Sequence, residues 1–321
     1  MALLGLDLGG TKLSLAVFNE NGKILQKETT ALNKRKGKEV GELIEKQINK
    51  FRERESAHDV LIESIGICIP GIYRLKTGTV WAPNIPGWED YPLLEEVKKA
   101  AGEIPVTIDS DRACYVLGEH WKGNAQQCKD VIFLAVGTGI GAGILTDGKV
   151  LRGSNDIAGA IGWMALNKPF NSEYISSGCF ESTASGEGIA RVAKKFLREN
   201  ESYSGELRNI PLEKITSRDV FTAYENKDTI ALKIIEACIE YWGMAIANLV
   251  SLFNPEKIIL GGGIFGPAIN LLPAIITETK KWAQPIGITQ VSIEASGLGN
   301  DAGIYGAGFL ALRNNNLSNT Q

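Results

Sequence analysis

The pattern of apolar and polar positions divides the chain into strands, turns and helices. An apolar run at residues 3–8 ends in a glycine turn, and a second apolar-rich run follows at 13–18, which predicts two strands joined tightly. The same pattern recurs at 131–136 and 142–145. Each pair then ends in an Asn-Gly or Asp-Gly hairpin signal. The sequence therefore predicts a duplicated half that contains two glycine hairpins.

The rest of the chain alternates between strand-like and helix-like segments. Apolar residues three and four apart predict helices at 40–51 and 231–253. A third helix, rich in small residues, is expected to end near residue 312, before a polar tail. Short apolar runs predict further strands at 64–69, 106–108 and 257–260. This alternation is typical of an α/β protein.

Composition and charge narrow the class of protein. With 321 residues, 44% hydrophobic and 22% charged, the chain fits a globular protein of two domains. A formal net charge of −3 gives no electrostatic reason to bind nucleic acid or an anionic membrane. Five cysteines without a C-x-x-C pair favour reduced thiols in the cytoplasm. We expect neither a leader nor a membrane-spanning stretch.

The two glycine turns suit phosphate. A carboxylate enters the first turn, and a hydroxyl and an amine leave it. Glycine lets a backbone present N–H groups to an anion, and the carboxylate can hold Mg²⁺ directly or through water. An ordinary glycine hairpin is the alternative for the first turn taken alone. The candidate phosphate and magnesium residues are Asp7, Gly9, Gly10, Thr11 and Lys12, with Gly137, Thr138 and Gly139 in the second turn.

A strand-to-helix junction supplies the candidate for proton transfer. The strand at 106–108 runs into Asp109-Ser110-Asp111, and open α/β sheets bind ligands at the carboxyl ends of their strands. Asp111 is therefore a candidate catalytic carboxylate, with a role as helix N-cap as the alternative. A third glycine turn, Gly261-Gly262-Gly263, allows close backbone approach to the nucleoside part of a nucleotide.

Four motifs lie in order over almost the whole chain: D-L-G-G-T-K at 7–12, G-I-C-I-P-G at 66–71, G-T-G-I-G-A-G at 137–143 and G-G-G at 261–263. Together they resemble the ROK (repressor, open reading frame, kinase) family of sugar kinases. The resemblance implies the two-lobed actin/hexokinase-like (ribonuclease H-like) ATPase fold with a duplicated core. It also implies an ATP- and Mg²⁺-dependent carbohydrate kinase that phosphorylates a sugar hydroxyl, usually the 6-hydroxyl.

The resemblance assigns roles to single residues. The catalytic aspartate of the family's Glu-Asn-Asp-Ala-Asn motif falls on Asp111, where this chain has Asp109-Ser110-Asp111-Arg112-Ala113. Phosphoryl transfer needs positioning and a carboxylate that accepts the proton of the attacking hydroxyl. Asp7 is expected to hold or orient Mg²⁺. The expected substrate-binding residues are Gly71, Asn84, Ser110, Asp111, Trp163 and Glu181.

The chain departs from the family at its zinc motif. Where many members have Gly-Glu-x-Gly-His, this chain reads G-A-I-G-W, so the glutamate is Ala160 and the histidine is Trp163. Only Cys179 remains of a C-x-C-G-x-x-G-C cluster, and one cysteine cannot supply four zinc ligands, so no zinc site is expected. Trp163, aided by Trp88 and Trp81, offers an apolar face for a sugar ring or an aglycone. Core packing is the alternative for Trp163.

These substitutions predict a changed acceptor. They remove groups that bond sugar hydroxyls and leave the phosphate residues alone, so a glycoside, a deoxy- or anhydro-sugar or a cyclic polyol is favoured over free glucose. Alternatives are a non-catalytic sugar-binding sensor, a kinase for a non-sugar polyol, and a repressor, whose helix-turn-helix would precede the first strand. We expect a homodimer, with a smaller lobe of 1–115 plus 300–321 and a larger lobe of 116–299.

Overall fold

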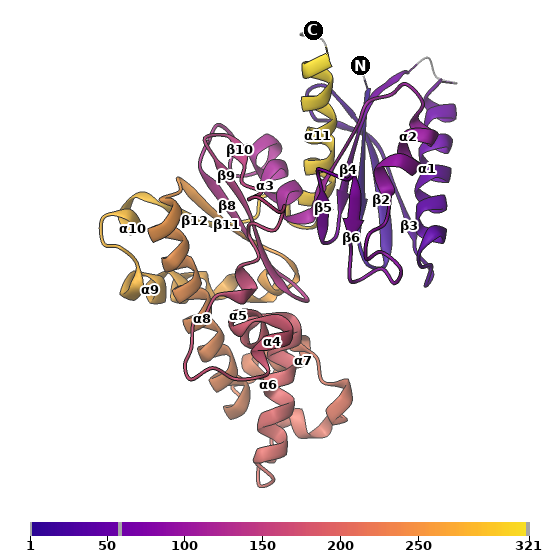
Figure 1. The fold of residues 1–321 in the computed structure, drawn as a ribbon. Coiled ribbons are helices and arrows are strands. Elements are labelled where there is room, and N and C mark those ends of the chain that lie inside the picture. The colour runs from indigo at the N-terminus through magenta and orange to yellow at the C-terminus, as the bar shows by residue number, and fades with distance from the viewer. Residues whose placement is uncertain (1, 57–59, 319–321) are drawn as a thin grey trace. The chain divides into compact units, whose positions relative to one another are not determined.

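The computed structural model describes residues 2–56 and 60–318 (Figure 1). The chain forms two compact units. The first comprises the described parts of 1–127, 150–158 and 297–321, and the second comprises 128–149 and 159–296. These bounds differ from the expected lobes of 1–115 with 300–321 and 116–299, because the segments 116–127, 150–158 and 297–299 also group with the first unit. That each lobe folds as an independent domain stays a prediction.

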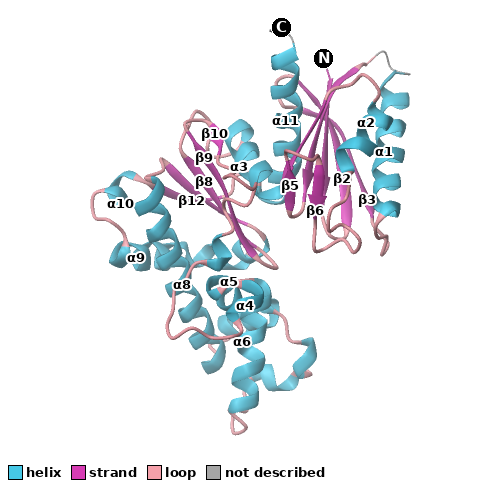
Figure 2. Cartoon of the chain, in the orientation of Figure 1, coloured by secondary structure: helices cyan, strands magenta, loops and turns pink. Residues whose placement is uncertain are grey.

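The first unit is built on a five-stranded sheet (Figure 2). Its strands are β1 (Ala2–Leu8), β2 (Lys12–Asn19), β3 (Ile24–Ala31), β4 (Ile62–Ile69) and β7 (Val106–Ser110). The order is β3-β2-β1-β4-β7, with β1, β2 and β3 antiparallel and β1, β4 and β7 parallel. A separate hairpin, β5 (Ile72–Arg74) and β6 (Thr79–Trp81), follows β4. Asp7, Gly71 and Asp111 thus lie at or just beyond the carboxyl ends of three adjacent parallel strands.

Helices cover both faces of this sheet. They are α1 (Lys38–Ser56), α2 (Leu93–Ala101), α3 (Asp111–Lys122) and α11 (Ala302–Ser318), the last preceded by the 3₁₀ turn η6 (Gly299–Asp301). Alternate residues of β1 point to opposite cores, so that Leu4 packs with the α1 side and Leu3 with α11. Glycine is required at Gly66 of β4, where a Cβ would lie 1.9 Å from the carbonyl oxygen of Ala307. Helix α11 continues to Ser318, beyond the predicted end near residue 312.

The second unit repeats the sheet plan of the first. Its order is β10-β9-β8-β11-β12, again with the two strands of the glycine hairpin, β8 and β9, antiparallel and with β8, β11 and β12 parallel. The strands are β8 (Val131–Val136), β9 (Ile140–Thr146), β10 (Lys149–Val150), β11 (Lys257–Gly261) and β12 (Ser292–Ala295). The predicted duplication is therefore confirmed, with β1, β2 and β4 corresponding to β8, β9 and β11.

Helices and 3₁₀ turns make up the rest of the second unit. The longest helix, α8 (Thr229–Phe253), buries its apolar stripe and ends at Asn254 in a left-handed conformation (φ 44°). Among the described residues, no helix is long and apolar enough to cross a membrane. The other helical elements are η1 (Ile161–Trp163), α4 (Tyr174–Ser177), α5 (Cys179–Ala184), α6 (Gly186–Glu199), η2 (Glu206–Asn209), η3 (Leu212–Lys214), α7 (Ser217–Glu225), η4 (Gly263–Phe265), η5 (Pro267–Leu271), α9 (Leu272–Trp282) and α10 (Gly287–Gln290).

Candidate active site

The first glycine turn joins β1 to β2 and leaves its tip open to solvent. The N–H of Gly9 donates to the carbonyl oxygen of Lys12 at 2.8 Å, which closes the turn. Gly10, Thr11 and Lys12 are exposed, so their polar groups can reach a ligand. This is the arrangement that a phosphate-binding turn requires.

Asp7 sits at the base of this turn, packed under the start of α11. A Cβ on Gly303 would lie 2.7 Å from Asp7 Oδ2, so the start of α11 packs closely against this carboxylate. Burial raises the pKa of Asp7, and a hydrogen bond from the Cys68 thiol and the charge of Lys12 partly oppose that rise. A buried carboxylate with a raised pKa, close to an open turn, is a candidate for holding a cation.

Asp111 is the first residue of α3, directly after β7. Its Oδ1 accepts the N–H of Arg112 at 2.8 Å, and its carboxylate also accepts the N–H of Gly71. Burial raises the pKa of Asp111 to about 6, the charge of Asp7 adds to the rise, and the Arg112 guanidinium opposes it. A carboxyl group with this pKa can accept a proton near neutral pH.

Ser110, and not Asp111, is the N-cap of α3. Its Oγ accepts the N–H of Ala113 at 3.3 Å, so the proposed alternative role of Asp111 as the cap is wrong. Ser110 is expected from the sequence to bind substrate, and its hydroxyl oxygen already accepts this hydrogen bond within the helix. Asn84, another expected substrate residue, is exposed, with its Cβ 3.5 Å from the position of a Cβ on Gly10.

The tryptophan-rich loop is only partly available to a ligand. Trp88 is 1% exposed, stacks on Tyr91 with 4.4 Å between ring centroids, and donates its indole N–H to Gly37 O at 2.9 Å. The suggestion that Trp88 contributes to a substrate surface is therefore wrong. Trp81 is 37% exposed. Gly71 has φ +101°, and a Cβ there would lie 2.2 Å from the Trp81 carbonyl oxygen, so glycine is required.

In the second unit, the glycine turn between β8 and β9 is bound to the start of α6. The N–H of Gly137 donates to Gly139 O at 2.9 Å, and the N–H of Gly186 donates to Gly137 O at 2.8 Å. Gly262 follows β11 with φ +92°, and a Cβ there would lie 2.4 Å from Val136 O. Gly263 faces open space, because a Cβ on it would meet no atom within 4 Å. The second and third predicted turns therefore lie beside each other.

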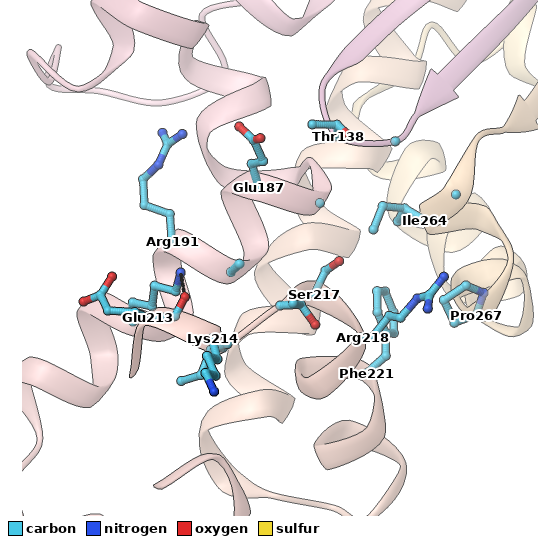
Figure 3. Close-up of a pocket in the computed structure, with 17 residues that line it drawn as sticks. Thr138, Glu187, Arg191, Glu213, Lys214, Ser217, Arg218, Phe221, Ile264 and Pro267 are labelled. Atoms are coloured by element: carbon cyan, nitrogen blue, oxygen red, sulfur yellow. Dashed lines mark hydrogen bonds between the residues drawn. The ribbon is translucent and has the colours of Figure 1, made fainter. Parts of the chain in front are cut away.

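A cavity of about 810 Å³ opens beside these turns (Figure 3). Thr138, Phe221 and Ile264 are among the residues that line it. Arginine and lysine side chains add positive charge, and a site of this size suits a nucleotide-sized ligand. The remaining lining residues are Gly137, Gly186, Glu187, Ala190, Arg191, Lys194, Glu213, Lys214, Ile215, Thr216, Ser217, Arg218, Gly263 and Pro267.

Glu181 and Trp163 lie on neighbouring segments of the second unit. Glu181 Oε2 accepts the N–H of Ile140 at 2.6 Å, so the glutamate is tied to the same glycine turn. Burial raises the pKa of Glu181, and the Ile140 hydrogen bond opposes that rise. Trp163 ends η1 and is 55% exposed, so core packing is excluded as its role. A Cβ on Gly178 would lie 2.6 Å from Trp163 Cα, which brings the start of α5 against this tryptophan.

The lining of the cavity was missed from the sequence, apart from its glycine turns. The side chains come from two stretches of the chain, one at 186–221 with α6, η3 and α7, and one at 263–267 with η4 and the start of η5, and no local motif marks the two as one site. One local signal was available. Ser185-Gly186-Glu187-Gly188 combines an N-cap serine, whose Oγ accepts the N–H of Gly188 at 3.0 Å, with glycines that permit close approach.

Zinc and magnesium require different sets of protein ligands. Across residues 2–56 and 60–318, no cluster of three or more His, Cys, Asp or Glu side chains suits a metal ion by itself. All five cysteines are free and buried. For Mg²⁺, one or two carboxylates suffice because substrate phosphates and water complete the shell, and Asp7 fits that requirement.

Known proteins resemble the chain over its full length. A glucokinase of Halalkalibacterium halodurans is 33% identical, with 98% of this chain and 96% of that protein aligned. A β-glucoside kinase of Listeria monocytogenes is 28% identical, with 98% and 99% aligned. A xylose repressor of Caldicellulosiruptor bescii is 32% identical, with 95% and 76% aligned.

A solved structure agrees with these relatives. The ROK family glucokinase of Streptomyces griseus, solved with glucose and AMPPNP, has a TM-score of 0.76 and 27% identity, covering 98% of this chain and 100% of that one. The fold is therefore the hexokinase-like ATPase fold that the motifs imply. The sequence profile of the ROK family matches residues 3–314. With that match and the glucokinase relative, the chain belongs to the ROK family.

Proposed function

We propose that this protein is an ATP-dependent sugar kinase that transfers the terminal phosphoryl group of ATP to a hydroxyl of its acceptor, expected to be the 6-hydroxyl. The observation that carries the proposal is Asp111, a carboxyl group at a parallel-strand end, held by two backbone N–H groups, with a pKa of about 6. The glucokinase and β-glucoside kinase relatives support it.

Residues of each unit have separate tasks in this proposal. Asp111 accepts the proton of the attacking hydroxyl, and Asp7 orients the cation. Bound Mg²⁺ would neutralise developing phosphate charge, and bound ATP would supply the phosphoryl group. In the second unit, Thr138 and Gly139 present their backbone to phosphate, and the cavity walled by Phe221 and Ile264 accepts the nucleoside.

The acceptor is proposed to carry an apolar or bulky substituent. Glu181 remains as a hydrogen-bond acceptor for a sugar hydroxyl, whereas position 160 holds alanine, which makes no such bond. The exposed ring of Trp163 offers a flat apolar surface of the kind that binds a sugar face or an aglycone. The β-glucoside kinase relative supports a glycoside. Free glucose and N-acetylated hexosamines should be poor acceptors.

A coupled ADP-release assay with Mg²⁺ over sugars, alkyl and aryl glycosides, anhydro-sugars and cyclic polyols tests both claims. We expect turnover of a glycoside above that of glucose, and its loss with EDTA. Trp163→Ala should reduce the preference for the glycoside. Trp282→Ala, which removes an exposed tryptophan of α9, is the matched control and should leave the preference unchanged.

Two outcomes would contradict the proposal. Sugar or glycoside binding without ADP release would favour a non-catalytic sensor, and turnover of polyols alone would favour a polyol kinase. Glucose turnover with kcat/KM on the order of 10⁴ M⁻¹s⁻¹ or more would overturn the acceptor class.

We further propose a cytoplasmic location, where free buried thiols stay reduced. The homodimer stays a prediction.

A further inference from the structure

The segment 150–158 belongs to the first unit, although the chain on either side of it belongs to the second. Before it, β9 and β10 form the edge of the second sheet. After it, Gly159 leads directly into η1 and Trp163. The sequence alone gives no reason for this excursion, and the structure shows what holds the segment in place.

An ion pair joins the segment to β7, the strand that directly precedes Asp111. Arg152 Nη1 lies 2.6 Å from Asp109 Oδ1, and Arg152 Nη2 bonds to Asp109 Oδ2. The pair is therefore bidentate, the geometry that best fixes direction as well as distance. The Asp109 side chain is 2% exposed and that of Arg152 is 29% exposed. A carboxylate this buried depends on its partner, because removal of the guanidinium leaves an uncompensated charge.

A second bond attaches the segment to the hairpin that follows Gly71. Asp156 Oδ2 accepts the N–H of Leu75 at 3.2 Å. Gly71 itself donates its N–H to Asp111. The segment is thus bonded to β7, which directly precedes Asp111, and to the β5–β6 hairpin, which directly follows Gly71.

The backbone of Arg152 also fixes where the chain leaves the segment. Its carbonyl oxygen accepts the N–H of Ala158 at 3.0 Å, so the segment closes into a loop on Arg152. The next residue, Gly159, is fixed to β9, because its carbonyl oxygen accepts the N–H of Ala142 at 2.8 Å. A Cβ on Gly159 would lie 2.0 Å from Ala142 O, so this close approach requires glycine. Arg152 therefore makes two connections. Its side chain binds Asp109, and its backbone closes the loop that precedes Gly159.

We propose that Arg152 is a positioning residue for phosphoryl transfer: it holds Asp109, two residues before the base, and so keeps Asp111 in place to accept the proton of the acceptor hydroxyl. This inference rests on the proposed sugar-kinase activity. Small displacements of reacting groups are costly, and a shift of about 1 Å can reduce a rate by about 100-fold. Loss of Arg152 should therefore act on the acceptor and on turnover, and leave the nucleotide cavity unaffected.

The test compares Arg152→Met, Arg152→Lys, Asp109→Asn and the double variant Arg152→Met/Asp109→Asn. The acceptor is the one identified with the panel above. Lys149→Met is the matched control, since it removes an exposed cation of β10 for which no ion pair or side-chain hydrogen bond is found in the described structure. Rates are measured at varied acceptor and varied ATP, the folded fraction by thermal melts, and AMPPNP affinity by calorimetry.

For Arg152→Met we expect an acceptor KM raised about 10-fold and kcat lowered about 10- to 100-fold, with AMPPNP affinity within about twofold of wild type. Arg152→Lys should recover part of the loss, because lysine keeps the charge without the bidentate geometry. The double variant should be less impaired than Arg152→Met, since it removes the unpaired carboxylate. If Arg152→Met does not fold, the acceptor KM, kcat and AMPPNP affinity of Arg152→Lys and Asp109→Asn are compared with those of wild type instead.

Two results would overturn the inference alone while wild type remains active. One is a set of variants with wild-type KM and kcat. The other is a loss of rate that follows the folded fraction with an unchanged acceptor KM, which would make the ion pair merely structural. A wild-type protein that phosphorylates no sugar or glycoside would instead overturn the proposed function, and this inference with it.

Discussion

Asp111 carries the proton transfer in the proposed reaction, so its replacement is the most direct test at the scale of one residue. Asp111→Asn keeps the shape of the side chain and removes the base, and general-base loss costs roughly 10² to 10⁴ in rate. Nucleotide affinity should persist, because the cavity lies in the other unit. Steady-state rates and calorimetry with AMPPNP check this. Turnover within a few-fold of wild type would show that another group is the base.

The pH dependence follows from the environment of the same residue. A base acts when deprotonated, so with a pKa of about 6 the rate kcat/KM should level off above pH 6 and fall as the pH drops below it. The Arg112 guanidinium favours the ionised carboxylate, so Arg112→Ala should raise the pKa of Asp111. The acid limb should then move to higher pH.

Arg112→Lys is the control for this prediction, because it keeps the positive charge and should leave the acid limb close to that of wild type. An acid limb that stays in place in Arg112→Ala would show that the guanidinium charge does not reach the base.

At the scale of elements, the close packing of α11 depends on glycine. A Cβ on Gly306 would lie 2.0 Å from Cys114 O, and a Cβ on Gly118 would lie 2.3 Å from Ala302 O. Gly306→Ala or Gly118→Ala forces α3 and α11 apart, and overpacking typically lowers the free energy of unfolding by about 1 to 3 kcal/mol. Chemical denaturation measures this. Gly266→Ala is the control, since the nearest atom to its Cβ is 3.5 Å away. Equal stability of all three variants would contradict the packing argument.

Elements that depend on local pattern could be predicted from the sequence, and contacts between distant segments could not. The hairpins and the strand that precedes Asp111 follow from apolar runs and glycine turns, and all are present. The Asp109–Arg152 ion pair joins residues that are 43 positions apart, and no local sequence pattern predicts it. Trp88 shows the same limit, because loop composition does not reveal that its ring is buried against Tyr91.

At the scale of the whole molecule, the fold should not depend on zinc. The chain lacks the family's histidine and most of its cysteine cluster, and Cys179 is the one cysteine of that cluster present. A structural zinc site needs about four N or S ligands. Elemental analysis of the purified protein should therefore find no stoichiometric zinc, and EDTA should leave the melting temperature unchanged. About one zinc per chain would show that other residues supply the ligands.

The division into discontinuous units has a consequence for biosynthesis. All segments of the second unit are made once translation reaches residue 296, whereas the first unit still waits for α11. Until then the face of β1 and β2 that carries Leu3 and Phe18 lacks its cover, Ile304. Chains that end at residue 296, held on the ribosome through a linker long enough to clear the exit tunnel, should resist protease in the second unit and be cut in the first. The unit that contains the N-terminus is thus the last to be completed, and one face of its sheet stays without α11 through most of translation.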